Sequence, residues 1–574
     1  MEMVTLTIDN QKVQVEKGQT ILDAAQKLGI NIPTLCHLKG INEIGACRVC
    51  VVEVEGMRTL SASCVTQATE GMVVHTNTPR VQKARKLNVE LLLGDHNYNC
   101  PSCIRNTKCE LQDVAERVGL REIRFDRGKS RYHQDQSTPA LVRDPEKCIL
   151  CRRCVSVCEK VQTVQAIVPL ERGMKTVIGS PFHEALADST CIQCGQCVLV
   201  CPTGALHEKE NIDEVWAALG NPKKHVVVQT APAIRVEISE EFGEEPGKVS
   251  TGKLVAALRR LGFDKVFDTD FTADLTIMEE GNEFLKRLQQ GKNLPLMTSC
   301  SPGWINFIET FYPELLPNLS TCKSPQQMFG ALAKTFYAQK AGINPKDIVS
   351  VSIMPCVAKK FEAQRPEMND SGCRDVDYVL TTRELARMIK QAGISFDRLS
   401  EENYDDPLGI STGAGLIFGA TGGVMEAALR TVYEIVTGEK LEDINFRHVR
   451  GLDGVKEAII QVGSTQVKVA VAHGISNARV LMEKVKSGAA DYHFIEIMCC
   501  PGGCIGGGGQ PIPTNTEIRA KRMKGIYEGD SAMTLRKSHE NPAVQALYQE
   551  FLGVPLGDKS HHLLHTSYTP RKKS

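Results

Sequence analysis

The sequence predicts a multidomain protein of mixed α+β and α/β class, on the basis of three observations. The chain has 574 residues, which exceeds the size at which a single hydrophobic core stops growing. Fifteen of its 22 cysteines precede residue 202 and stand in short, regularly spaced groups. After residue 210, apolar strand-like segments alternate with segments of helical periodicity, as in an α/β domain. We therefore expect small cysteine-rich domains followed by one large α/β domain.

Composition and charge narrow the classes of partner. Lys plus Arg and Asp plus Glu both number 68, and this zero net charge argues against nucleic acid as the main partner. No apolar run approaches the roughly 18 residues of a membrane helix, and the first residues do not look like a secretory signal. We expect a soluble, cytoplasmic protein with no nucleic-acid or membrane partner. Because disulfides are rare in a reducing cytosol, the grouped cysteines indicate metal sites.

Residues 1–80 are expected to form a small β-rich domain. "TLTIDNQKVQVEKG" predicts a β-hairpin, and "TILDAAQKLGI" predicts a helix. Cys36, Cys47, Cys50 and Cys64 follow, three in one loop and the fourth after a later strand. Ferredoxin-like β-grasp domains hold a [2Fe–2S] cluster in this way, although the long first gap makes this a looser variant of their spacing. Zinc is the alternative, because four thiolates also suit that ion.

Residues 81–125 begin with a helical segment, "RVQKARKLNVELLLGDH", and continue into a second group of possible ligands. His96, Cys100, Cys103 and Cys109 offer one imidazole and three thiolates, which suit a [4Fe–4S] cluster or zinc. The alternative for His96 is a surface histidine at a helix end, but its place ahead of three cysteines favours a ligand. We predict a histidine/three-cysteine [4Fe–4S] domain.

Residues 126–210 carry the same cysteine pattern twice. "CILCRRCVSVC" and "CIQCGQCVLVC" both match the C-x2-C-x2-C-x3-C run of bacterial ferredoxins with two [4Fe–4S] clusters. In such pairs the fourth cysteine of each run binds the other cluster. The expected ligand sets are Cys148, Cys151, Cys154 and Cys201 for one cube, and Cys191, Cys194, Cys197 and Cys158 for the other. Four clusters before residue 202 would form an electron wire, so we expect it to end at a site that uses electrons.

Residues 211–574 are expected to hold that site in an α/β domain. Strand-like segments such as "KHVVVQTAP", "KVAVAHGI" and "YHFIEIM" alternate with helical ones such as "STGKLVAALRRLGF" and "TTRELARMIKQAG". The stretches "TSCSPGW", "IMPCVAKKFEAQRPE" and "EIMCCPGGCIGGGGQP" each follow an apolar strand and precede a turn. Sites in α/β folds form at strand ends, and converging thiolates there bind a soft metal. Cys322 and Cys373 lack this context, so we expect buried structural thiols.

These three stretches resemble the signature motifs of [FeFe]-hydrogenases, and the four preceding clusters resemble those of the long, monomeric clostridial type. The resemblance covers nearly the whole chain. It implies a ferredoxin hydrogenase that reversibly reduces protons to H2 with electrons from ferredoxin or flavodoxin. It also implies an H-cluster, a [4Fe–4S] cube joined through one cysteine to a two-iron subsite with CO, cyanide and an azadithiolate bridge. Dedicated maturation proteins would install that subsite.

Matching motif positions to the family implies roles for residues of this chain. Cys356 and Cys500 resemble cube ligands, and Cys504 resembles the cysteine that bridges cube and subsite. Lys359 resembles a group that hydrogen-bonds cyanide; the alternative is a surface ion pair with Glu362. Other residues that resemble the surroundings of the subsite are Gln326, Pro232, Met354, Phe418 and Met498, with Ala233 where many relatives have a serine.

The stretch "TSCSPGW" departs from the family motif T-S-C-C-P. The first cysteine of that motif passes protons and the second binds the cube, and here these positions are Cys300 and Ser301. Three interpretations remain open. Ser301 binds iron through oxygen, a harder donor; or the loop shifts so that Cys300 is the ligand and Ser301 the relay; or the extra thiol of Cys499 compensates. A fourth is a site that binds its cube poorly or differently.

A proton route to the buried metal is predicted from one helical segment. In "TIMEEGNEFLKRLQ", Glu280, Glu283 and Arg287 share one face of a helix. The alternative is a solvated face with an ordinary Glu283–Arg287 pair. The family resemblance favours the route, because its members pass protons from the motif cysteine through positions that match these residues and Ser320.

Two other classes of function compete with a turnover enzyme. An electron-transfer subunit like the large iron–sulfur subunit of NADH dehydrogenases would share the first two cluster patterns but not the later motifs. A hydrogen-sensing or iron–sulfur assembly protein could share the catalytic fold and tolerate the change at Ser301. A third possibility is the catalytic subunit of a larger hydrogenase complex, although this chain shows no G-x-G-x-x-G nucleotide-binding fingerprint.

Overall fold

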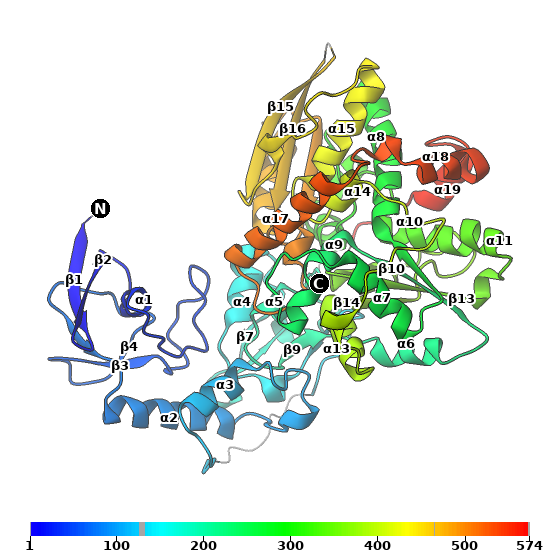
Figure 1. The fold of residues 1–574 in the computed structure, drawn as a ribbon. Helices are drawn as coiled ribbons and strands as arrows, with labels where there is room; N and C mark the ends of the chain where they lie inside the picture. The colour runs from blue at the N-terminus through cyan, green and yellow to red at the C-terminus, as the bar shows by residue number, and fades with distance from the viewer. Residues whose placement is uncertain (1, 126–132, 464, 572–574) are drawn as a thin grey trace. The chain divides into compact units, whose positions relative to one another are not determined.

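The computed structural model describes residues 2–125, 133–463 and 465–571 (Figure 1). The chain divides into two compact units. Unit 1 comprises Met1–Ser137, Leu141–Cys191 and Val200–His207, and unit 2 comprises Thr138–Ala140, Ile192–Leu199 and Glu208–Ser574. The domain start predicted at residue 126 lies outside the described residues.

Unit 1 begins with a five-stranded sheet in the order β2-β1-β5-β3-β4. Its strands are β1 (Met3–Ile8), β2 (Gln11–Glu16), β3 (Val51–Val54), β4 (Ser61–Ala62) and β5 (Val73–His75). The β1–β2 pair is antiparallel around Asp9 and Asn10, whose positive φ angles of 46° and 68° suit the tight turn of a hairpin. Helix α1 (Ile21–Lys27) starts at a capping box between Thr20 and Asp23. The predicted hairpin and helix are therefore confirmed.

The rest of unit 1 consists of short elements around the cysteine groups. They are α2 (Pro79–Gly94), α3 (Glu110–Arg117), α4 (Arg153–Ser156), β6 (Leu141–Arg143), β7 (Val168–Leu170), β8 (Val177–Gly179) and β9 (Leu206–Glu208). Helix α2, which the sequence predicted, is capped by Thr78 and has Pro79 at its first position. Cys36, Cys47 and Cys109 pack within one hydrophobic cluster, so cysteines form part of the core here.

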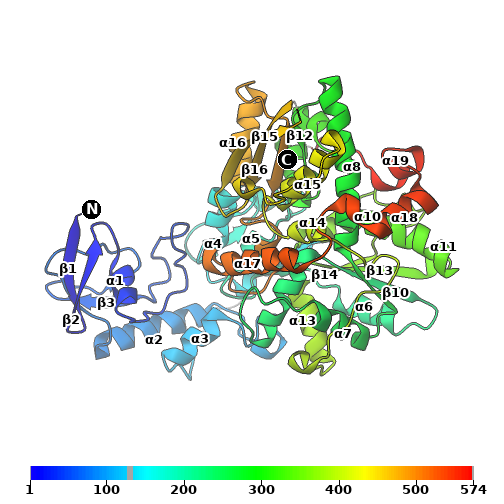
Figure 2. The same cartoon turned by 45° about the horizontal axis from the view of Figure 1, so that its top comes forward.

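Unit 2 contains two four-stranded sheets (Figure 1). The first is wholly parallel, in the order β11-β10-β13-β14, with β10 (His225–Thr230), β11 (Lys265–Asp268), β13 (Ile348–Met354) and β14 (Tyr378–Thr381). The second runs β12-β17-β16-β15, with β12 (Leu296–Met297), β15 (Val455–Val462), β16 (Thr465–His473) and β17 (Phe494–Met498). Strands β15 and β16 form an antiparallel hairpin with α16 (Ile475–Lys486) beside it (Figure 2). The predicted mixture of strands and helices is confirmed.

Helices cover these sheets and separate their cores. Besides α16 they are α5 (Gln196–Val200), α6 (Ile212–Leu219), α7 (Thr251–Leu261), α8 (Thr269–Gln290), α9 (Pro302–Phe311), α10 (Pro325–Leu332), α11 (Ala338–Ala341), α12 (Ala358–Glu362), α13 (Thr382–Gln391), α14 (Gly413–Ile417), α15 (Gly423–Thr437), α17 (Thr516–Ala532), α18 (Pro542–Leu547) and α19 (Asp558–Leu564). Helix α8 contributes Phe271 and Leu275 to one core and Ala273 and Ile277 to another. Among the described helices, none combines the length and apolar character needed to cross a membrane.

Parallel strands of unit 2 end where the three cysteine stretches begin. Strand β12 ends three residues before Cys300, β13 ends two residues before Cys356, and β17 ends next to Cys499. Strands β12 and β17 are parallel neighbours in one sheet and β13 belongs to the other, so the carboxyl ends of strands from both sheets carry these cysteines. Cys322 is fully buried, as predicted, whereas the prediction for Cys373 is wrong: it is only half-buried, in a turn beside Ser371.

Candidate active site

The first cysteine group forms a compact set of thiols in unit 1. The Sγ atoms of Cys50 and Cys64 lie 3.2 Å apart, and the thiol of Cys36 is hydrogen-bonded to those of Cys47 and Cys64. All four side chains are buried. Four soft donors around one point suit either a [2Fe–2S] cluster or zinc, so the geometry fits a metal centre here.

The second group contains an imidazole with one buried, unpartnered nitrogen among the described residues. Nδ1 of His96 is buried and has no hydrogen-bond partner among the described residues. Burial lowers the pKa of His96 to about 4, which keeps the imidazole neutral, the form that binds metal. A Cβ on Gly204 would lie 2.8 Å from Sγ of Cys103, so this glycine leaves space for the thiol. The donor set fits the predicted ligand role.

The third group lines a cavity in unit 1. Cys148, Cys151, Cys154 and Cys201 all border it. The backbone turns sharply between the first three, since Leu150 and Arg152 have positive φ angles of 54° and 61°. In the second run of the repeat, the matching residues Gln193 and Gly195 have positive φ angles of 55° and 72°. The repeat in sequence is thus a repeat in backbone conformation. The remaining set divides between the units, with Cys158 and Cys191 in unit 1 and Cys194 and Cys197 in unit 2.

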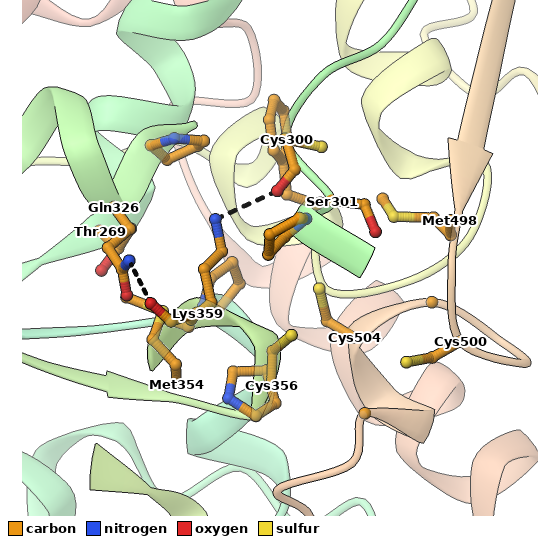
Figure 3. A pocket seen from close by; sticks show the side chains of 18 of the residues that line it. Thr269, Cys300, Ser301, Gln326, Met354, Cys356, Lys359, Met498, Cys500 and Cys504 are labelled. Carbon is orange, nitrogen blue, oxygen red and sulfur yellow. Dashed lines mark hydrogen bonds between the residues drawn. The ribbon is translucent and has the colours of Figure 1, made fainter. Parts of the chain in front are cut away.

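Unit 2 holds a cavity that all three C-terminal cysteine stretches border (Figure 3). The centre of a water-sized sphere can move through about 80 Å³ of it, several times the roughly 10–15 Å³ that one water needs. Its cysteines are Cys300, Cys356, Cys499, Cys500 and Cys504. Five soft donors around one space suit an iron–sulfur centre better than a hard cation.

Four consecutive glycines allow the last of these stretches to pack closely. A Cβ on Gly506 would lie 2.0 Å from the carbonyl oxygen of Pro501, and one on Gly507 would lie 2.2 Å from that of Pro355. A Cβ on Gly508 would meet the carbonyl oxygen of Cys194 at 2.4 Å. Backbone atoms cannot give way as flexible side chains do, so the run "GGGG" fixes the loop that carries Cys504.

Lys359 reaches the cavity from α12. Its Nζ donates to the carbonyl oxygen of Cys300 at 3.1 Å (Figure 3) and also to Oε2 of Glu362 at 2.9 Å. The ion pair with Glu362 therefore exists, but Lys359 is only 8% exposed, so it is not a surface pair. Gln326 donates to Glu362 and to the carbonyl oxygen of Lys359, while its own Oε1 is buried without a partner among the described residues. Such an orphaned atom suits a site that holds a further group.

Most of the predicted lining residues border the cavity. Those that do so are Pro232, Gln326, Met354, Phe418 and Met498. Ala233 does not; it is fully buried in the adjacent hydrophobic core. The sequence did not single out Thr269, Ala273 and Pro325, which also line the cavity. Their side chains carry no metal-binding or titratable group, so no motif signals them.

Ser301 ties two of the cysteine stretches together. It precedes α9 as the N-cap, a position that serine favours, yet its side chain makes no capping hydrogen bond. Its Oγ instead accepts a hydrogen bond from the backbone N–H of Cys499 at 3.2 Å. Cys499 is itself buried, and its thiol is hydrogen-bonded to the thiols of Cys194 and Cys500.

Four residues of the predicted proton route, without Cys300, form one hydrogen-bonded line. The carboxyl of Glu280 is hydrogen-bonded to Ser320, whose Oγ donates to Oε2 of Glu283 at 3.2 Å. Arg287 donates to Oε1 of Glu283 at 2.5 Å. Glu280, Glu283 and Arg287 are 2%, 7% and 9% exposed, so the alternative of a solvated helix face is wrong.

Burial sets the protonation of the inner end of this line. It raises the pKa of Glu280 to about 8, although the hydrogen bond with Ser320 acts in the opposite direction. Burial also raises the pKa of the Cys300 thiol well above its ordinary value, with the nearby Glu280 charge acting in the same direction. Near neutral pH both groups therefore carry protons that they can pass on.

The C-terminal segment contributes contacts that the sequence did not suggest. Glu283 also accepts the backbone N–H of Thr321 at 3.1 Å, and Thr321 Oγ1 lies 2.8 Å from Nδ1 of His565. Nε2 of His565 lies 3.1 Å from Oε2 of Glu279. No spacing rule connects Thr321 with a residue 244 positions later, so sequence reasoning offered no signal.

Five stretches of the chain match known families. Residues 1–79 match "2Fe-2S iron-sulfur cluster binding domain", and residues 85–124 match "NADH-ubiquinone oxidoreductase-G iron-sulfur binding region". Residues 147–205 match "4Fe-4S dicluster domain". Residues 224–508 match "Iron only hydrogenase large subunit, C-terminal domain", and residues 516–571 match "Iron hydrogenase small subunit".

Two relatives resemble the chain over its length. NADP-reducing hydrogenase subunit HndD of Solidesulfovibrio fructosivorans is 53% identical, with 100% of both chains covered. Iron hydrogenase 1 of Clostridium pasteurianum is 42% identical over 99% of this chain and 100% of its own. Among solved structures, an apo [FeFe]-hydrogenase of Chlamydomonas reinhardtii is 46% identical with a TM-score of 0.57, covering 63% of this chain and 99% of its own.

Proposed function

Because this chain belongs to the iron-only, or [FeFe]-, hydrogenase family, we propose that it reversibly reduces protons to H2 at the cavity of unit 2. The observation that carries the proposal is the meeting of two features at that cavity. Thiols from three separate stretches border it, and a buried line of hydrogen-bonded groups ends at Glu280, whose charge acts on the thiol of Cys300 at the cavity wall. Metal redox chemistry and proton supply are the two requirements of this reaction.

We assign the H-cluster to this cavity. Cys356 and Cys500 would hold its cube, and Cys504 would bridge cube and two-iron subsite. The subsite supplies the metal at which electrons and protons combine. Lys359, buried beside Cys300 with its ammonium toward the cavity, can hydrogen-bond an anionic cyanide there, and Gln326 has a free acceptor nearby. Pro232, Met354, Phe418 and Met498 surround the site with apolar groups that exclude water.

We assign one [2Fe–2S] and three accessory [4Fe–4S] clusters to the predicted N-terminal sets. Three features support this assignment. They are the hydrogen-bonded thiols of the group from Cys36 to Cys64, the unpartnered Nδ1 of His96, and the cavity that Cys148 and three further cysteines line. These clusters accompany a β-grasp domain at residues 1–80, a histidine/three-cysteine domain at 81–125 and a ferredoxin domain at 126–210, ahead of the catalytic domain at 211–574. The matched families support this division.

Protons would reach the cavity through side chains of the line described above. Arg287 and Glu283 form the outer end, and Ser320 can accept a proton from Glu283 while donating one to Glu280. Glu280 then reprotonates Cys300, whose thiol borders the cavity. A thiol suits the last step better than the alcohol of Ser301, because its ordinary pKa of about 8.5 is nearer to neutrality.

We further propose that the chain works in the cytoplasm, with ferredoxin or flavodoxin as electron partner and maturation proteins that supply the subsite. The test is hydrogen evolution by the matured chain with reduced ferredoxin, with reduced flavodoxin and with a reduced viologen dye. Evolution with either protein donor supports the proposal. Activity with the dye alone would contradict the choice of partner, and inactivity with all three in an iron-replete chain would contradict the hydrogenase itself.

The second candidate is the catalytic subunit of a larger complex. It is favoured by the relative that is 53% identical over its whole length and is named as a subunit of an NADP-reducing hydrogenase. Since this chain has no G-x-G-x-x-G fingerprint, NADP reduction would need a partner chain. The discriminating experiment compares H2-dependent NADP reduction by the chain purified alone with that by material purified gently from its native cells. Activity confined to the native material, with additional chains present, would favour the complex.

A further inference from the structure

A [4Fe–4S] cube is ordinarily held by four thiolates, and the assigned site provides three undisputed ones. Cys356, Cys500 and Cys504 border the cavity from two of the three stretches. The fourth donor must come from the remaining groups at the wall, which are Cys300, Ser301 and Cys499. Their contacts distinguish them.

Ser301 is poorly suited to bind iron. An alcohol oxygen is a harder donor than thiolate, and soft iron–sulfur clusters prefer sulfur. The Oγ of Ser301 already accepts the backbone N–H of Cys499. This hydrogen bond gives the serine a structural function, since it joins the loop before α9 to the loop after β17.

Cys300 borders the cavity and also lies near the proposed proton route. Its carbonyl oxygen accepts from Lys359, and the charged groups near its thiol include Glu280 of the route and Lys359 and Cys504 of the cavity wall. The same side chain packs at the edge of the hydrophobic core around α8 and α15. If Cys300 bound the cube, the line that ends at Glu280 would lose its thiol at the cavity wall.

Cys499 has the placement that a ligand needs. It is 3% exposed, lines the cavity and has its thiol hydrogen-bonded to that of Cys500. The hydrogen bond from its backbone N–H to Oγ of Ser301 keeps Cys499 close to residue 301, the position that holds a cube ligand in the family motif. A Cβ on Gly303 would lie 2.6 Å from Sγ of Cys499, so the glycine at the start of α9 leaves space for this thiol.

We propose that Cys499 is the fourth thiolate ligand of the catalytic cube. The inference rests on the proposed function, because it concerns the same cluster. Binding replaces the S–H bond of Cys499 by an Fe–S bond and releases the thiol proton to solvent. The contact between Cys499 and Cys194, a predicted ligand of an accessory cube, then places ligands of two clusters side by side for electron transfer.

The test counts iron in the full chain expressed without maturation proteins, so that the two-iron subsite is absent. On the assigned stoichiometries the chain should hold about 18 iron atoms, and Cys499→Ala should hold about 14, with loss of the electron paramagnetic resonance signal of one reduced cube. Ser301→Ala should keep about 18. Cys373→Ala, which removes a half-buried thiol in a surface turn, is the matched control and should also keep about 18.

A rescue variant separates a lost ligand from a damaged fold. Ser301→Cys in the Cys499→Ala background returns a fourth thiol to the same wall, so it should restore about 18 iron atoms and the missing signal. The proposal is overturned if Cys499→Ala keeps its iron and signal, if Ser301→Ala loses them, or if the rescue variant stays at about 14 while remaining folded. The iron content and the resonance signal are both measured in the chain that lacks the two-iron subsite. Failure of the hydrogenase proposal would appear separately, as an inactive matured wild type.

Discussion

Charged side chains removed from water are the residues on which this site depends. Lys359 is paired with Glu362, and Arg287 is paired with Glu283, each pair buried beside the cavity or its proton route. A buried pair adds little net stability, but removing one partner leaves an uncompensated charge and is costly. Glu→Gln keeps the shape of the side chain but still removes one charge of such a pair, so the stability of each variant is measured together with its activity.

Glu283→Gln should lower hydrogen turnover on the order of 10²-fold or more, because an amide cannot relay a proton between Arg287 and Ser320. Infrared bands of CO and cyanide should stay unchanged, since Glu283 does not border the cavity. Glu279→Gln is the matched control, because Glu279 is buried in the same helix but is hydrogen-bonded to Tyr548 and His565 instead. Equal turnover in the Glu283 variant and the control would remove Glu283 from the route.

Glu280→Gln should change how stability depends on pH. The pKa of Glu280 rises from 4.5 to about 8 on folding, so the native state binds more protons than the unfolded state between these values. Its contribution to the free energy of unfolding is full below about pH 4.5 and is lost as pH rises through about 8. The groups that face it are Glu283, Glu496, Arg287 and Cys300.

The measurement is the apparent melting temperature of wild type and Glu280→Gln, at a fixed scan rate, between about pH 5 and about pH 8.5. The wild type should lose more stability across this window than the variant. Glu279→Gln again serves as control: its hydrogen bonds hold the pKa of Glu279 below the ordinary value despite burial, so its difference from wild type should stay flat. A flat difference for Glu280→Gln would contradict the raised pKa.

Helix α8 is the element that connects the cavity with the proposed proton route. It begins at Thr269 on the cavity wall and carries Glu280, Glu283 and Arg287 farther along, over a length of about 33 Å at 1.5 Å per residue. Two hydrophobic cores pack against α8. They hold the helix in place, so the cavity end and the outer end of the hydrogen-bonded line keep fixed positions relative to each other. The loop "GGGG" does the same for the cysteines, because its backbone packs directly on Pro355.

Gly507→Ala should disturb the site through that loop. Its Cβ would lie 2.2 Å from the carbonyl oxygen of Pro355, so the loop or the end of β13 must move, at a cost of about 1–3 kcal/mol. We expect a lower melting temperature and a lower iron content in the catalytic cube. Gly220→Ala, whose Cβ finds its nearest atom at 3.4 Å, should leave both nearly unchanged. Wild-type iron and stability in Gly507→Ala would show that the close packing is not required.

Across the whole molecule, the sequence predicted local chemistry better than long-range contacts. Cysteine spacings predicted the grouped thiols around Cys36 and the repeated run of ligands, whose two copies share positive φ angles at Leu150 and Gln193. The site at the strand ends followed from the parallel α/β pattern. The hydrogen bond from Cys499 to Ser301 and the link from Thr321 to His565 depend on packing between distant segments, so no spacing could reveal them.

The same distinction explains the two corrected expectations. Cys373 was expected to be buried because it lacked a motif, but burial depends on what packs over a turn. Ala233 follows Pro232 directly in the 3-10 helix Pro232–Val236, yet only Pro232 lines the cavity, since successive residues of a helix point in different directions. The burial of Glu280 likewise came from the resemblance and the fold, not from helical spacing alone.

Iron content tests the cluster inventory of the matured chain. We expect about 20 iron atoms per chain, with four accessory clusters, the catalytic cube and the two-iron subsite all present. Elemental analysis against protein concentration measures the count. A value near 14 would mean that the accessory clusters are filled while the catalytic site is empty, which would contradict the assignment of the cavity in unit 2.

The most direct test of the central claim is hydrogen evolution by the same purified chain before and after the two-iron subsite is installed. The cavity is proposed to react only when that subsite is bound beside Cys300, Cys504 and Lys359. We therefore expect no evolution beforehand, and turnover together with infrared bands of CO and cyanide afterwards. Hydrogen evolution from the chain with cubes alone, or none after installation despite these bands, would contradict the account.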